Sequence, residues 1–142
     1  MDTWGIGLAA YVVSLVGASA GGPECVELVE LDYARSQAYA AASVERLEQV
    51  YVDEQAAQPD VDALLAWTER GYRLETAMQI VGSCEVVGRG EGEARLRVVD
   101  RLAPTAAVDE HGDRVPLPRD DWSERDVLLR QTDVEWRYAG VE

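Results

Sequence analysis

Between residues 60 and 102 the spacing of apolar positions changes from a helical period to a strand period. Asp60 is predicted to cap a helix, on which Leu64 and Trp67 fall along one stripe. Gly71 follows, where a helix end favours a residue that tolerates positive φ. This stretch therefore begins with one amphipathic helix that ends near Gly71.

After Gly71 the alternation has period two, which predicts two long strands. The first is expected to place small or apolar side chains on one face: Leu74, Thr76, Met78, Ile80, Gly82, Cys84 and Val86. Three glycines in residues 88–92 predict a turn. The second strand places Ala94, Leu96, Val98 and Leu102 on one face, so the pair predicts an antiparallel hairpin with one buried face.

Asp100 breaks this pattern, because unbroken alternation puts its carboxylate on the apolar face between Val98 and Leu102. A buried carboxylate is costly unless it is paired or faces a polar cavity. A β-bulge near Val98 and Val99 would turn Asp100 outward, and an ion pair with a nearby arginine would make it structural. The remaining interpretation is a carboxylate inside a pocket.

Helices are predicted before the hairpin and further strands after it. Residues 24–42 carry a helical stripe, Ser43 is a predicted N-cap for a short helix through Tyr51, and residues 53–60 are predicted as a loop. After the hairpin, residues 115–118 predict an edge strand or loop. Residues 122–131 and 134–138 predict two more strands. Helices gathered before an antiparallel sheet indicate an α+β fold, with the helices packed on one curved sheet.

Residues 4–20 are uncharged and rich in Ala, Val, Leu and Gly. A secretory signal peptide, a membrane anchor and a buried helix all remain open, because no basic residue precedes the segment. We place a boundary in the glycines before Pro23, giving an apolar segment at 1–23 and a domain at 24–142. Export or anchoring predicts an extracytoplasmic location, and a buried helix predicts a cytoplasmic one.

The chain is strongly acidic. Its 142 residues carry a formal charge of −14, with a sequence pI near 4.4. This charge argues against binding nucleic acid or an anionic membrane surface. No cofactor motif is present, and one histidine with two distant cysteines does not match a metal site. Cys25 and Cys84 are a candidate disulfide in an exported domain, and two separate thiols are the alternative.

The sequence resembles nuclear transport factor 2-like, or SnoaL-like, domains over residues 25–140. The resemblance rests on the element order and on four segments, residues 32–41, 44–51, 97–102 and 134–138. It is greatest to exported or membrane-anchored members from bacteria with GC-rich genomes. It implies a cone-shaped, cystatin-like architecture that often encloses a pocket.

Some members of that superfamily are isomerases, cyclases or dehydratases that use an acid and a histidine inside the cone. The one histidine here, His111, falls in a predicted turn, and Asp100 is the only acid expected inside. The sequence therefore favours a non-enzymatic domain that binds a small apolar ligand or a protein partner, with a homodimer possible. The alternative is a small isomerase or cyclase with Asp100 as general base.

Candidate pocket residues are the aromatic positions near the predicted cone and the unpaired acid: Tyr33, Trp67, Tyr72, Asp100 and Trp136. For Trp67, Tyr72, Trp122 and Trp136, packing in the core or at the cone mouth is the simpler interpretation, and stacking on a ligand is the second.

Overall fold

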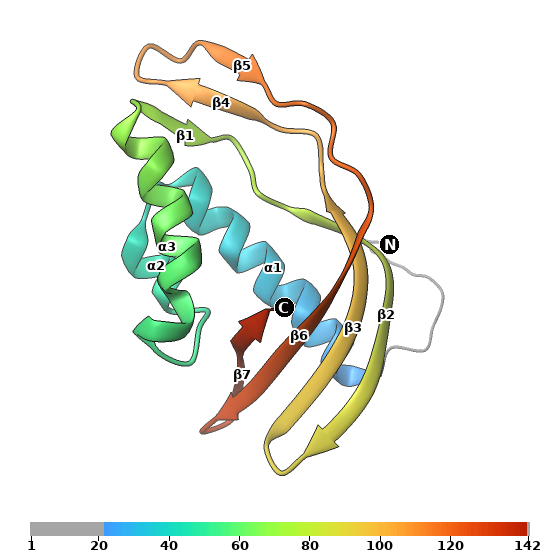
Figure 1. Cartoon of the computed structure of the whole chain (residues 1–142). Coiled ribbons are helices and arrows are strands. Elements are labelled where there is room, and N and C mark those ends of the chain that lie inside the picture. Colours follow the sequence, from blue (N-terminus) through green and yellow to red (C-terminus); the bar gives the residue numbers. More distant parts are fainter. Residues whose placement is uncertain (1–21, 142) are drawn as a thin grey trace.

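The computed structural model describes residues 22–141, which form three helices followed by seven strands (Figure 1). In chain order these are α1 (Pro23–Ala40), α2 (Val44–Glu48), α3 (Glu54–Glu69), β1 (Tyr72–Leu74), β2 (Gln79–Gly90), β3 (Glu93–Leu102), β4 (Ala106–Asp109), β5 (Arg114–Pro116), β6 (Ser123–Thr132) and β7 (Glu135–Val141). The α+β prediction is confirmed. This is also the architecture that the resemblance implied.

The strands divide into two antiparallel sheets. Four strands in the order β2-β3-β6-β7 form a long curved sheet that wraps around α1 (Figure 1), and β1-β4-β5 form a small second sheet. The predicted hairpin is confirmed as β2 and β3, which turn at Gly92 with φ +68°. The predicted edge position of residues 115–118 is also confirmed, since β5 is the outer strand of the small sheet.

The first predicted strand is divided by the structure, because β1 joins the small sheet and β2 begins only at Gln79. Within β2, Gly82 is an extra residue between the pairs Val81–Asp100 and Ser83–Val99. This bulge reverses the alternation, so that Val81, and not Gly82, points into the core. A Cβ atom at residue 82 would lie 3.0 Å from the Trp122 ring, which explains the glycine.

The prediction that α3 begins at Asp60 is wrong. The helix begins at Glu54, where the Asp53 side chain accepts a hydrogen bond from the Ala56 N–H at 2.8 Å. Pro59 therefore lies inside the helix, and Asp60 is buried. Residues 53–60 were predicted as a loop because they are polar and contain a proline, and the neighbouring sequence does not indicate that Asp60 is buried against a partner.

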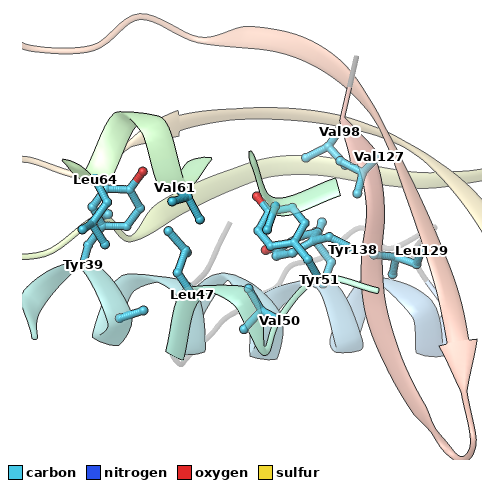
Figure 2. Close-up of a cluster of buried hydrophobic side chains, with 14 of the residues drawn as sticks. Tyr39, Leu47, Val50, Tyr51, Val61, Leu64, Val98, Val127, Leu129 and Tyr138 are labelled. Carbon is cyan, nitrogen blue, oxygen red and sulfur yellow. The ribbon is translucent and has the colours of Figure 1, made fainter. Parts of the chain in front are cut away.

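The core fills the space between the helices and the curved sheet (Figure 2). Among its fully buried side chains are Leu28, Leu47, Leu64, Leu96, Val98, Val127, Leu129 and Tyr138. Each buried aliphatic side chain stabilises the fold by about 1.5–3 kcal/mol relative to an exposed one. Val127 and Leu129, which the alternation along residues 122–131 places on one face, both point into this core.

The first turn of α1 is joined to β2 by two contacts. Cys25 and Cys84 form a disulfide, and Arg89 Nε lies 2.7 Å from Glu24 Oε2. The disulfide closes a loop with a sequence separation of 59 residues. Together these contacts fix where α1 crosses the sheet.

Of the apolar segment predicted at residues 1–23 as a signal peptide, an anchor or a buried helix, residues 1–21 lie outside the described residues. Within residues 22–141, no helix has the length and apolar character needed to span a membrane.

Removal of the disulfide by Cys25→Ser together with Cys84→Ser is expected to lower the free energy of unfolding by about 4 kcal/mol. The reason is that the cross-link restricts a long loop in the unfolded chain. Urea denaturation of the oxidised protein and of the double variant measures this difference. The double variant should not respond to a reductant, and equal stability of the two proteins would contradict the prediction.

Candidate functional site

A polar cluster occupies the cone interior next to the apolar core. It combines α1 residues Asp32 and Arg35 with Asp60 from α3, Asp100 from β3 and Arg125 from β6. Asp32, Asp60 and Asp100 are 1%, 9% and 2% exposed. The expectation that Asp100 is the only acid inside is therefore wrong.

Helical spacing explains how α1 contributes to the cluster. Leu28, Asp32, Ser36 and Tyr39 are all buried on one side of the helix, and they recur every three or four residues. The stripe predicted from the sequence was Leu28, Leu31, Ala34, Ala38 and Ala41; it included the buried Leu28 and Ala38 but passed over Asp32, Ser36 and Tyr39, because polar residues at the same spacing look like a solvent-exposed face. The sequence signal for this buried side is that Asp32 and Ser36 recur at helical spacing between Leu28 and Tyr39.

Arg35 and Asp60 form a two-point ion pair between α1 and α3. Arg35 Nε lies 2.6 Å from Asp60 Oδ2, and Nη2 donates to Oδ1 at 2.9 Å. Tyr51 donates to Oδ2 at 2.8 Å, and Tyr39 donates to Oδ1. Burial raises the pKa of Asp60, but the hydrogen bond and charge of Arg35 outweigh it, so this pKa lies below its usual value.

The second ion pair joins β3 to β6. Arg125 Nη2 and Nε lie 2.6 and 2.9 Å from Asp100 Oδ2. Asp100 thus keeps its predicted inward direction and is paired there, because the bulge lies on β2 and not on β3. Burial raises the pKa of Asp100, and the positive charge of Arg125 offsets part of that effect.

Asp32 is the carboxylate without an arginine of its own. Arg125 Nη2 is 3.9 Å from its Oδ1, which accepts a hydrogen bond from the Tyr138 hydroxyl. Its Oδ2 is buried and accepts no hydrogen bond from residues 22–141. Burial raises the pKa of Asp32 to about 6, and Arg125 only partly counteracts this.

These groups line a partly open pocket of about 370 Å³. Its lining residues are Asp32, Arg35, Tyr51, Pro59, Asp60, Gln79, Asp100, Asp120, Ser123, Arg125, Tyr138 and Val141. The pocket is of a size that ligand sites in proteins commonly have, although it is more polar than most. Arg125 carried a sequence signal, since it alternates with the inward residues Val127 and Leu129.

Of the five predicted pocket residues, only Asp100 lines this pocket. Tyr33 is 57% exposed on α1 and accepts a hydrogen bond from Gln37 Nε2 at 2.8 Å. Trp67 is half-buried against the core, with the Arg70 guanidinium 5.4 Å from its ring centre. Tyr72 begins β1 in the other sheet.

Trp136 lines a different hollow, an open groove of about 700 Å³ between α1, α2 and β7. Its walls include Glu27, Leu31, Arg46 and Val134. Although this groove is larger, no side chain lining it has a buried, unpaired polar atom within the described part of the chain.

Two further sequence predictions have clear outcomes. Trp122 is neither part of the buried core nor a lining residue of the pocket. Its side chain is 49% exposed, and the Arg101 guanidinium lies 4.7 Å from its ring centre. His111 is exposed in a turn, as expected, so it supplies no base to the pocket.

Across residues 22–141, no group of three or more His, Cys, Asp or Glu side chains is arranged to hold a metal ion.

No protein-family model and no curated protein matches the sequence. Solved structures do match. The intermembrane space region of the chloroplast protein ARC6 aligns with a TM-score of 0.52 and 8% identity, covering 89% of this chain and 97% of its own. A protein from Novosphingobium aromaticivorans, proposed to be an aromatic ring hydroxylase, aligns with a TM-score of 0.51 and 13% identity, covering 84% and 87%.

A designed protein of the nuclear transport factor 2 type is more distant, with a TM-score of 0.46 and 9% identity over 84% of this chain and 95% of its own. At such identities the likeness to the ARC6 region and to the Novosphingobium protein establishes a shared fold and leaves the function open.

Asp32→Asn is expected to stabilise the protein at neutral pH. Folding raises the pKa of this acid from near 4 to about 6, so the folded state holds the proton more tightly. Its contribution to stability therefore falls as pH rises from about 4 to 6, and stays low above that. Removing the charge should recover roughly 1–3 kcal/mol at pH 7.5 and little at pH 4. Urea denaturation at both pH values measures this.

Asp60→Asn is the matched control, because it removes one buried carboxylate charge that has a full set of partners. It should destabilise the protein by about 3–5 kcal/mol, since Arg35 would be left buried without its counter-ion. The prediction is wrong if both variants lose the same free energy of unfolding. It is also wrong if the free energy of unfolding of Asp32→Asn changes with pH between 4 and 7.5 in parallel with that of the wild-type protein.

Proposed function

We propose that this protein is a cone-shaped binding domain that holds a small polar molecule in the pocket between α1, α3 and the curved sheet. The observation that carries this proposal is the buried, unpaired Oδ2 of Asp32 in the pocket wall. A buried carboxylate oxygen with no donor costs free energy, and a ligand that donates to it would recover that cost.

The chemistry of the lining revises the kind of ligand expected. The sequence favoured an apolar ligand, but four aspartates, two arginines and two tyrosine hydroxyls line the pocket. Such a wall suits a small molecule with several hydrogen-bonding groups. The two ion pairs fix the positions of these groups, so the site is formed before a ligand arrives.

We also propose that the domain acts outside the cytoplasm. Disulfides persist mainly in oxidising compartments, and Cys25 on α1 is bonded to Cys84 on β2. The uncharged, apolar residues 4–20 also support export or membrane anchoring.

Blocking the pocket mouth tests the binding function. Fragments of mixed charge added to the full chain should shift the backbone amide NMR signals of Gln79 and Ser123, both in the pocket wall. Ser123→Phe should weaken these fragments at least about tenfold, which is the effect of losing one good contact. Gln131→Phe, on the same strand but outside the pocket, is the control. Fragments that bind elsewhere, or that bind Ser123→Phe equally well, would contradict the proposal.

An acid–base enzyme is the second candidate, and Asp32 now replaces Asp100 as its base. Asp100 is held by Arg125, whereas Asp32 has a free oxygen and a pKa of about 6. A buried carboxylate with such a pKa can take a proton from carbon next to a carbonyl group near neutral pH.

Proton exchange provides a direct test of this second function. Cyclohexenone in D₂O is a simple probe, because a base in the pocket would exchange its acidic C–H positions for deuterium, which NMR detects. The wild-type protein should accelerate the exchange and Asp32→Asn should lose at least about a hundredfold of that rate, the usual contribution of a positioned base. No acceleration over the same concentration of acetate buffer would leave binding as the function.

A further inference from the structure

Resting on the proposed binding function, we infer that the ligand of this pocket carries a positively charged amine, and that Asp32 binds it. The argument uses the unequal number of charges in the pocket wall and the way in which each one is paired.

The pocket wall contains more negative than positive side chains. Its acids are Asp32, Asp60, Asp100 and Asp120, and its bases are Arg35 and Arg125. Arg35 is bound at two points to Asp60. Arg125 is bound to Asp100 at 2.6 Å, while Asp32 is 3.9 Å away. Within residues 22–141, Asp32 therefore shares Arg125 with Asp100 and has no counter-ion of its own.

A protonated amine meets both requirements of Asp32. It donates a hydrogen bond to Oδ2 and supplies the missing positive charge, whereas a neutral hydroxyl supplies the hydrogen bond alone. Arg125 Nη2 lies 2.6 Å from Asp100 Oδ2 but makes no hydrogen bond within residues 22–141, so an anion that approached it would still meet the excess of carboxylates in the pocket wall. The pocket is thus selective for cations over neutral molecules and for neutral molecules over anions.

Two tyrosines also line the pocket. The rings of Tyr51 and Tyr138 have centres 5.2 Å apart, and the Tyr138 hydroxyl donates to Asp32. Aromatic rings stabilise ammonium groups within about 6 Å of their faces. A volume of about 370 Å³ is near the lower end for ligand sites, so a single-ring amine is of suitable size.

Protons compete with such a ligand. Burial raises the pKa of Asp32 to about 6, so in more acidic solution the free protein neutralises Asp32 with a proton. The other charged groups that face this carboxylate are Arg125, Asp100 and Arg35, and the two arginines keep their charge throughout. Amine binding should therefore weaken as pH falls from 7.5 to 5.

Three probes of matched shape test the inference on the full chain: benzylammonium, benzyl alcohol and benzoate. NMR titration at pH 7.5 should give benzylammonium at least about tenfold tighter binding than benzyl alcohol, which is the usual advantage of a charged over a neutral hydrogen bond. Benzoate should not bind in the pocket. Lowering the pH to 5 should weaken benzylammonium more than benzyl alcohol, because only the amine also loses its opposite charge.

Two variants with the same change of charge separate Asp32 from the general acidity of the protein. Asp32→Asn should remove the preference for benzylammonium over benzyl alcohol. Asp126→Asn, on the outer face of β6 beside Arg95 and Arg97, should keep it. If Asp126→Asn loses the preference as well, or Asp32→Asn keeps it, attraction by the net charge explains the binding and the inference is wrong.

The outcomes also distinguish this inference from the binding function itself. Benzoate binding among the pocket residues would overturn the cation preference and leave the binding function intact. If none of the three probes binds and the mixed fragments also fail to shift Gln79 and Ser123, both proposals fail. The probe comparison on the unmodified protein does not depend on the folding of either variant.

Discussion

The ion pair between Arg35 and Asp60 is the contact on which the arrangement of the helices depends. It joins α1 to α3, and hydroxyl groups from Tyr39 and Tyr51 complete the bonding of the same carboxylate. A buried pair of this kind contributes little net stability compared with an apolar contact, but removing one partner is costly. It therefore fixes one relative position of the helices, and α3 tolerates Pro59 one residue before its buried acid.

With Arg35 engaged, Arg125 is the other base in the pocket wall, and it must serve two carboxylates. An interior selected for stability alone would not keep Asp32 there, because an apolar residue of similar volume would cost less. Sites that lower stability in this way are typical of function, where a protein accepts a local penalty to hold a reactive or binding group. The rest of the cone is apolar and well packed, which supplies the stability that tolerates this group.

The sequence predicted features that are local and missed those that depend on pairing across the fold. The Ser43 cap, the positive φ at Gly71 and the turn at Gly92 follow from short-range geometry, and the structure has all three. For Asp100 the sequence left a paired acid and a pocket acid as alternatives, and the structure combines them. Its partner Arg125 lies 25 residues away, and no local pattern indicates which arginine reaches a given acid.

The Cys25–Cys84 bond also determines how the domain would respond to tension. A pull on the start of α1 passes through the disulfide to Cys84 on β2, the edge strand of the curved sheet, so it does not peel α1 away turn by turn. The antiparallel ladder between β2 and β3 would then carry the load along its whole length. Most of the pocket wall comes from α1 beyond its first turns, from α3 and from β6 and β7, and two of its residues, Gln79 and Asp100, lie on the strands that carry this load.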